Sequence, residues 1–121
     1  MRLYELLEVD FKHEDQKGRL IQLVNSGFKQ INVLVSYRGA KRGGHFHQTT
    51  KEAFYVISGS VDVKLVRKNE KEIVHFNEGD FFVINPNITH EMSFPEDCVM
   101  VVLYEKPVTL EDGTRDIIKA D

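Results

Sequence analysis

The sequence predicts an all-β protein of the sandwich, jelly-roll or barrel kind. Short runs rich in Val, Ile, Phe and Tyr follow one another along most of the chain, and Gly, Pro or polar turn signals separate them. No segment of useful length has helical periodicity. Short strands with a turn about every eight to twelve residues are typical of this class.

The expected strands fill the core of the chain, from about residue 19 to residue 105. They are the ranges 19–24, 30–37, 45–48, 52–58, 60–66, 72–76, 80–84, 89–94 and 98–104. Alternation is clearest around Val61, Val63 and Leu65, which polar residues separate. Residues 1–10 could form an edge strand or a short helix, and 107–121 have too little periodicity to assign.

Length and charge indicate a single domain, 1–121, with no nucleic-acid partner. A chain of 121 residues can bury a core without metal or disulfide staples, so a bound metal would serve chemistry. The 16 basic and 19 acidic residues give a net charge of -3, and the basic residues are scattered rather than gathered in a stripe.

Cysteine use and hydropathy favour a cytoplasmic protein. Cys98 is the single cysteine, so no intrachain disulfide can form, which fits a reducing compartment. The start of the chain carries acidic residues where a secretory signal needs an apolar stretch, and the longest apolar run is 98–104. We therefore expect neither export nor a membrane partner.

Two histidines stand two positions apart in an expected strand. Side chains so spaced leave the same face of the strand, about 7 Å apart along it, so the imidazoles of His45 and His47 should lie side by side. Glu52 follows a polar turn and opens the next strand, on the same face as Phe54. We expect this face to form the barrel interior.

His90 is the fourth candidate, because it stands at the head of the strand 89–94 with Met92 and Phe94 on its own face. Three imidazoles and a carboxylate that converge in an apolar barrel make a site for one divalent transition metal, such as Fe, Mn, Ni, Co, Zn or Cu. The predicted metal ligands are His45, His47, Glu52 and His90. The absence of a thiolate makes zinc the less natural structural metal.

The full spacing carries more weight than the histidine pair. The chain contains five histidines, so a His-x-His pair arises by accident with a probability of about one in five. Such an accidental pair would place two histidines on a solvated rim of the barrel. The positions Gly39, His45, His47, Glu52 and Gly59, with five, one, four and six residues between them, match the first cupin motif throughout. This spacing favours the ligand set over a chance pair.

The chain therefore resembles the cupin superfamily over about residues 30–105. A second, looser motif opens at Gly79, and Pro86 precedes His90 by one residue fewer than in the common form. The resemblance implies a double-stranded β-helix, the RmlC-like jelly-roll barrel, as the fold of the single domain.

Basic residues precede the first histidine at the expected barrel mouth. Arg42 lies three residues before His45, with Arg38 and Lys41 close by. A guanidinium can clamp a phosphate or carboxylate with two hydrogen bonds, whereas a solvated basic loop would bind nothing. We predict that Arg42 and Lys41 bind an anionic small-molecule substrate.

Beyond these motifs the chain is similar to the nucleotide-sugar 3,4-ketoisomerases of deoxysugar and surface-polysaccharide biosynthesis, the WxcM-like cupins. The similarity rests on KGRLIQLV, RGGHFH, VISGSVDVKLV and EDCVMVVLY. It implies a homodimer that shifts a keto group between neighbouring carbons of a dTDP-linked 6-deoxyhexose. It also implies that His45 and His47 are the catalytic acid and base and that Arg42 contacts substrate.

The chain departs from that family in its ligand set. The family generally works without a metal and lacks the carboxylate and the late histidine, whereas Glu52 and His90 are both present here. QINVLV also lacks the tyrosine that the family would supply there. An imidazole that donates its lone pair to a metal cannot take a proton from a sugar, so the two roles compete for His45 and His47.

Three classes of function stay open. The first, which we predict, is an isomerase or epimerase acting on a nucleotide-linked keto sugar, favoured by the basic barrel mouth and by similarity outside the metal motif. The second is a dioxygenase-type oxidoreductase dependent on Fe, Mn or Ni, favoured by the complete ligand set. The third is a non-catalytic barrel that binds a small ligand.

A homodimer is also expected from the pattern of apolar residues. Phe46, Tyr55 and Ile57 have the parity opposite to the ligands, so the sheet carries apolar side chains on both faces. Such a sheet needs a second cover, and its edge strands need partners.

Overall fold

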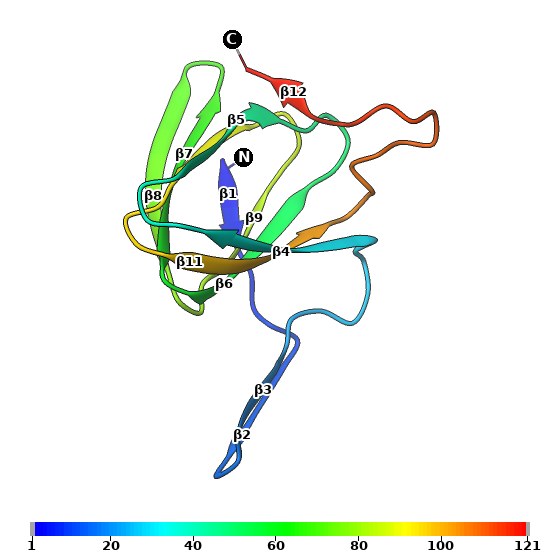
Figure 1. The fold of residues 1–121 in the computed structure, drawn as a ribbon. Coiled ribbons are helices and arrows are strands. Elements are labelled where there is room, and N and C mark those ends of the chain that lie inside the picture. The colour runs from blue at the N-terminus through cyan, green and yellow to red at the C-terminus, as the bar shows by residue number, and fades with distance from the viewer. Residues whose placement is uncertain (1, 121) are drawn as a thin grey trace.

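The structure is a computed structural model that describes residues 2–120 (Figure 1). Its strands are β1 (Tyr4–Leu6), β2 (Phe11–Asp15), β3 (Gly18–Gln22), β4 (Gln30–Ser36), β5 (Lys41–Phe46), β6 (Glu52–Ser58), β7 (Ser60–Arg67), β8 (Glu70–Asn77), β9 (Phe81–Ile84), β10 (Thr89–Ser93), β11 (Cys98–Tyr104) and β12 (Ile118–Lys119). The predicted all-β class is confirmed. Among residues 2–120 there is no helix of the length and apolarity that a membrane span requires.

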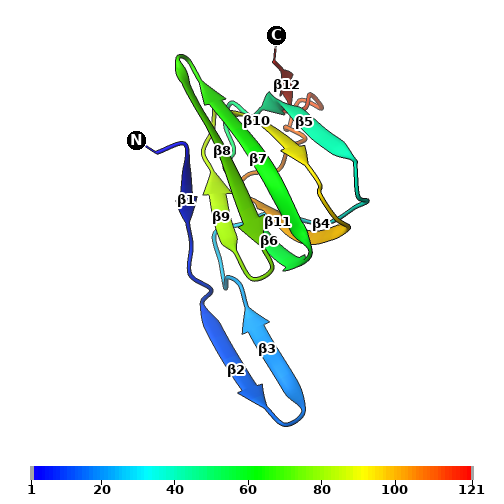
Figure 2. The same cartoon turned by 90° about the vertical axis from the view of Figure 1, so that its left-hand side faces the viewer.

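Two five-stranded antiparallel sheets enclose the main core. The first has the order β1-β9-β6-β11-β4 and the second the order β12-β5-β10-β7-β8. Figure 2 shows β8, β7, β10 and β5 side by side in one layer. Of the two alternatives for the first ten residues, the edge strand is realised, because β1 pairs with β9.

Inward-pointing apolar side chains, at every second residue of the strands, fill the space between the sheets. On β7, Val61, Val63 and Leu65 are fully buried, as their shared parity predicts. Aromatic rings stack at the centre of this core, where the ring centroids of Phe76 and Phe82 lie 3.7 Å apart. The core also takes in residues outside the range 19–105, such as Leu3.

A glycine allows β6 to turn directly into β7. Gly59 has a φ of 80°, in the left-handed region that side chains rarely adopt. A Cβ at this position would also collide with the carbonyl oxygen of Asp97. The turn therefore requires glycine.

The outer face of the first sheet carries a second apolar cluster. Its buried members are Ala53, Phe81, Val83 and Leu103. Chain segments on either side of the β2–β3 hairpin cover it, while the hairpin itself extends away from both sheets (Figures 1 and 2). On the neighbouring edge strand β4, the side chains of Ile31, Val33 and Val35 stay exposed.

Candidate functional site

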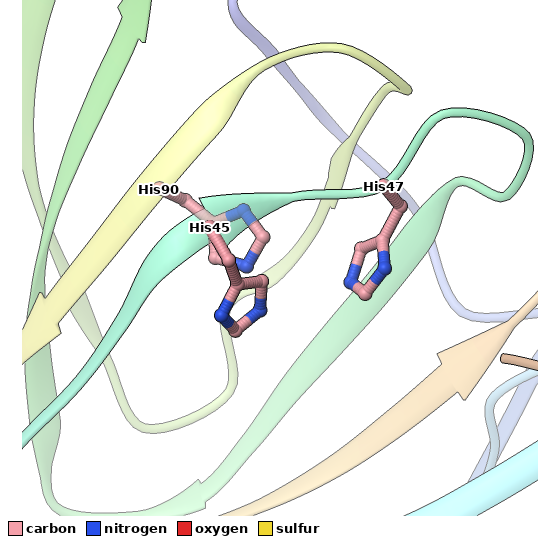
Figure 3. Close-up of side chains that lie close together, drawn as sticks. All are labelled: His45, His47 and His90. Atoms are coloured by element: carbon pink, nitrogen blue, oxygen red, sulfur yellow. The ribbon is translucent and has the colours of Figure 1, made fainter. Parts of the chain in front are cut away.

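Three histidines converge on one side of the barrel interior. His45 lies on β5, His47 follows the end of that strand, and His90 lies on β10. Each offers a ring nitrogen, and these nitrogens lie within 4.8 Å of one another. Figure 3 shows the three imidazoles gathered in the same space beside β5. The ring centroids of His45 and His90 are 4.7 Å apart.

A bulge in β5 aligns this strand with β10. His45 pairs with His90, but the next pair is Gly43 with Glu91, so Gly44 is an extra residue. Gly43 and Gly44 have φ values of 100° and 74°. A Cβ on Gly43 would collide with the carbonyl oxygen of His90. The two glycines thus permit both the bulge and the close approach of the strands.

The bulge also changes which basic residue faces the site. Simple alternation would put Arg42 and His45 on opposite faces, yet both line the same cavity. The Arg42 guanidinium donates hydrogen bonds to the Ser36 hydroxyl at 2.9 Å and to the Val35 carbonyl at 3.0 Å. Lys41 is exposed and does not line the cavity, so the structure does not bring this predicted substrate residue to the site.

The cavity beside the histidines has a volume of about 340 Å³. Its walls are made by Asn32, Leu34, Arg42, Gly43, His45, Glu52, Phe54, His90, Met92, Val102 and Tyr104. Polar and apolar groups are both represented, as in most small-molecule sites. His47 does not line the cavity, although it lies against Glu52, which does.

Glu52 lies on the sheet opposite the histidines, and its carboxylate contacts two of them. It is 4% exposed, and its Oε1 atom lies 2.9 Å from His47 Nε2 and 3.3 Å from His90 Nε2. Tyr104 on β11 pairs directly with Glu52, and interaction with the Tyr104 hydroxyl helps to lower the pKa of the carboxylate. Burial alone would raise the pKa of Glu52, but the hydrogen bond from His47 and the charge of His90 hold this pKa below its usual value.

The position of one proton follows from the partners of His47. Its Nδ1 faces the backbone carbonyl of Asp116, which can only accept, so Nδ1 carries the hydrogen. Nε2 of the neutral ring then has a lone pair facing the Glu52 carboxylate, which also only accepts. A proton or a metal cation must therefore lie between His47 Nε2 and Glu52 Oε1.

The donor set fits a divalent metal. His90 has the same orientation as His47, with Nδ1 3.4 Å from the Ile88 carbonyl and Nε2 toward Glu52. Metal-binding imidazoles commonly donate their other N–H to a backbone carbonyl in this way. The group with mutually close ligand atoms consists of the three histidines, and Glu52 meets two of them through Oε1.

The surroundings of the three imidazoles shift their pKa values in different directions. Burial lowers the pKa of His45, and the neighbouring His90 and His47 lower it further, so His45 is neutral near pH 7. Burial also lowers the pKa of His90. Burial would lower the pKa of His47 as well, but the hydrogen bond and charge of Glu52 raise it above its ordinary value.

The structure adds three site residues that the sequence reasoning missed. Tyr104 and Asn32 line the cavity, and Asp116 binds His47 from the C-terminal segment. Tyr104 continues the inward parity of Met100 and Val102, so strand alternation could have found it. No sequence signal marks Asp116, because the segment around it has no periodicity.

Fold and site together define a cupin jelly roll with histidines and a carboxylate beside an internal cavity. The family model described as "Polysaccharide biosynthesis C-terminal domain" matches residues 13–108. The chain belongs to this family, and the predicted recognition of the cupin class is confirmed.

Solved structures support the same fold. The sugar 3,4-ketoisomerase QdtA from Thermoanaerobacterium thermosaccharolyticum is 22% identical, with a TM-score of 0.79 over 97% of this chain and 88% of that one. The TDP-quinovose 3,4-ketoisomerase WlaRB from Campylobacter jejuni is 21% identical, with a TM-score of 0.82 over 98% and 94%. At these identities the likeness confirms the predicted jelly-roll barrel.

A relative found by sequence similarity is named as a dioxygenase, not as a sugar isomerase. The 3-hydroxyanthranilate 3,4-dioxygenase of Candida albicans is 33% identical over 72 residues, which is 59% of this chain. The match spans 42% of the dioxygenase's own length.

Proposed function

We propose that this protein is a sugar isomerase or epimerase that acts on a nucleotide-linked keto-deoxysugar in carbohydrate biosynthesis, and that as an isomerase it shifts the keto group of the 6-deoxyhexose by one carbon. The observation that carries the proposal is the position of the His45 imidazole on the wall of a cavity that Arg42 also lines, and burial lowers the pKa of this imidazole, which suits a base. Membership of a polysaccharide biosynthesis family supports the reaction class. The QdtA structure with TDP-4-keto-6-deoxyglucose supports the kind of substrate.

The proposed reaction moves protons only. His45 removes the proton from the carbon that bears the hydroxyl next to the carbonyl, and the electron pair left behind forms an enediolate. The imidazolium then returns a proton to the former carbonyl carbon, while the hydroxyl proton passes from one oxygen to the other. The keto group has moved by one carbon, and no atom is gained or lost.

The other site residues take supporting roles in this proposal. Arg42 supplies positive charge for the diphosphate, because it alone of the two predicted basic residues lines the cavity. His47 does not line the cavity and is separated from the sugar by Glu52, so it acts through that carboxylate. This is a change from the sequence-based expectation, in which His47 shared the acid and base work with His45.

A divalent metal is compatible with these roles. His47, Glu52 and His90 would hold it, since both imidazoles point their Nε2 atoms toward the same carboxylate oxygen. The sequence-based ligand set also included His45, and its ring nitrogen lies within 4.8 Å of those of His47 and His90. In this proposal His45, which makes no such contact with Glu52, stays off the metal and moves the proton. When bound, the metal would supply Lewis-acid stabilisation of a negatively charged substrate oxygen.

A metal-dependent dioxygenase is the second candidate function. It is favoured by the match to the Candida albicans dioxygenase and by a donor set of two imidazoles and one carboxylate, which suits non-haem Fe(II). In that case His45 and Arg42 would position an anionic substrate in the cavity.

One experiment separates the two functions. The protein is incubated in D₂O with TDP-4-keto-6-deoxyglucose, and the sugar is examined by mass spectrometry. An isomerase incorporates deuterium, and His45→Ala abolishes incorporation while His75→Ala, on the surface, does not. Absence of incorporation, together with oxygen consumption by the iron-loaded protein on 3-hydroxyanthranilate, would establish the dioxygenase instead.

The surface supports a homodimer as part of the proposal. Ile31, Val33 and Val35 form an exposed apolar row on the edge strand β4, and the β2–β3 hairpin extends from the barrel with Phe11 and Leu20 exposed. A two-stranded hairpin has little stability alone, so both features call for cover. A second copy of the chain would supply it.

A further inference from the structure

Asp116 makes a concentrated set of contacts with the loop that carries His47. It lies in the C-terminal segment, is 3% exposed, and stands 69 residues from His47 in the sequence. Its carboxylate accepts hydrogen bonds from the backbone N–H groups of Gln48 at 2.7 Å, Thr49 at 2.9 Å and Thr50 at 3.2 Å. The Thr49 hydroxyl donates a fourth bond at 2.8 Å.

The backbone of the same residue holds the imidazole. The Asp116 carbonyl oxygen accepts the Nδ1 hydrogen of His47, which turns Nε2 toward Glu52. Asp116 thus contacts four consecutive residues, 47–50, through both its side chain and its main chain. Next to it, β12 pairs with β5 at Phe46 and at His45, so the segment is fixed beside the site.

We propose that Asp116 is a positioning residue of the site, which fixes the 47–50 loop through its carboxylate and the orientation of the His47 ring through its carbonyl. The inference rests on the proposed function in so far as His47 belongs to the working site. Asp116 itself does not line the cavity, so it acts on substrate only through His47 and Glu52.

A buried carboxylate is suited to this role. The loop turns four polar backbone and side-chain donors toward one point, and without an acceptor they would be unpaired at a partly buried position. A carboxylate can accept all of them, whereas the amide of asparagine has one accepting oxygen and presents N–H donors to the same groups. Asp116→Asn should therefore loosen the loop with little change in side-chain size.

The test compares Asp116→Asn with Asp112→Asn in the full chain. Asp112 is the matched control, because among residues 2–120 its exposed carboxylate accepts hydrogen bonds from its own turn alone, namely from the Thr114 N–H and hydroxyl. Three quantities are measured: amide hydrogen exchange of residues 48–50, the tautomer of His47 by long-range ¹H–¹⁵N NMR, and deuterium incorporation into TDP-4-keto-6-deoxyglucose.

The expected results distinguish positioning from general stability. In the wild type, His47 keeps its hydrogen on Nδ1, where the Asp116 carbonyl accepts it, whether a proton or a metal cation lies at Nε2. In Asp116→Asn we expect a mixture of tautomers, faster amide exchange at 48–50, and incorporation slower by about 10- to 100-fold, the usual effect of losing such a supporting residue. The apparent KM should change far less than kcat, because Asp116 does not touch the substrate. Asp112→Asn should behave like the wild type.

Two further outcomes keep the inference open to refutation. A folded Asp116→Asn variant with the wild-type His47 tautomer and wild-type amide exchange would overturn it. Should Asp116→Asn fail to fold, Thr49→Val removes one donor from an exposed residue, and an unchanged His47 tautomer and unchanged loop exchange there would overturn it too. Absence of both deuterium incorporation and a keto-shifted product in the wild type would refute the proposed function, while the NMR and exchange data would still decide the role of Asp116.

Discussion

Glu52 and Tyr104 lie directly opposite each other on β6 and β11, and both line the cavity, where the Tyr104 hydroxyl interacts with the buried carboxylate. Burial and then the negative charge of Glu52 raise the pKa of Tyr104, so this hydroxyl keeps its proton throughout the physiological range. Glu52 in turn links the wall of the cavity to His47, which does not line it.

Tyr104→Phe should therefore destabilise the protein without altering the packing of the ring. The Glu52 carboxylate, 4% exposed, would lose its interaction with the Tyr104 hydroxyl, which as a hydrogen bond to a charged group is expected to contribute about 1.5–3 kcal/mol. Urea unfolding should show a loss of that order. The control is Tyr37→Phe, because Tyr37 is 72% exposed, and equal losses in both variants would contradict the linkage.

The second prediction concerns metal binding. We expect about one transition-metal ion per chain, and we expect the double variant His47→Ala, Glu52→Ala to abolish binding, because these residues face each other at 2.9 Å and point toward His90. Elemental analysis measures the metal, and circular dichroism checks that the β-fold persists. His75→Ala removes a surface histidine and should retain the metal. Undiminished metal in the double variant would refute the ligand assignment.

The third prediction is a homodimer held by the exposed face of β4. Light scattering should give twice the 14.0 kDa of one chain. Val33→Lys, at a side chain that is 68% exposed on this face, should convert the dimer to a monomer. Ile73→Lys changes a side chain that is 65% exposed on β8, in the other sheet, and should leave the dimer intact. A monomeric wild type at micromolar concentration would exclude the proposal.

The parts of this fold that the sequence predicts are those that follow from the alternation of apolar residues along the strands. Val61, Val63 and Leu65 point inward as their parity indicates, and Glu52 shares the inward face of Phe54. The closeness of His45, His47 and Glu52 follows from the same local rule, because two-residue spacing and the hairpin connection fix where these side chains point. His90 joins them through the pairing of β10 with β5, which no local rule gives.

The features that sequence reasoning missed depend on contacts between distant segments or on irregular backbone. Asp116 reaches the His47 loop across 69 residues of sequence, and nothing in its neighbours announces this contact. Whether Arg42 or Lys41 faces the cavity is decided by the extra residue at Gly44, and a bulge cannot be located from alternation alone.

The fourth prediction is a pH dependence away from the site. The hydrogen bond with Asp62, at 2.6 Å, raises the pKa of His75 above its ordinary value of 6.5. A group with a raised folded-state pKa contributes stability fully below its unfolded pKa and loses that contribution as pH rises through the folded value. NMR titration should place the His75 midpoint above 6.5, and Asp62→Asn should lower it. An unchanged midpoint in this variant would contradict the pairing.

The last prediction tests the substrate subsite on β5. Arg42 lines the cavity, and its guanidinium is held by Ser36 and Val35, so its charge is placed before any ligand arrives. A preorganised cation beside a diphosphate forms charge-assisted hydrogen bonds, each contributing about 1.5–3 kcal/mol, so Arg42→Ala should weaken binding of a dTDP-sugar by about tenfold or more. Metal content should not change, because Arg42 contacts none of the predicted ligands.

Lys41→Ala is the matched control, since it removes the neighbouring positive charge from a side chain that does not line the cavity. Isothermal titration calorimetry with TDP-4-keto-6-deoxyglucose measures both variants at the same ionic strength. A direct contact predicts a large loss of affinity for Arg42→Ala and a small one for Lys41→Ala, which reflects long-range attraction alone and disappears at high salt. Equal losses that vanish together as salt is added would show that the barrel mouth attracts the ligand only by its net charge, and that Arg42 forms no diphosphate subsite.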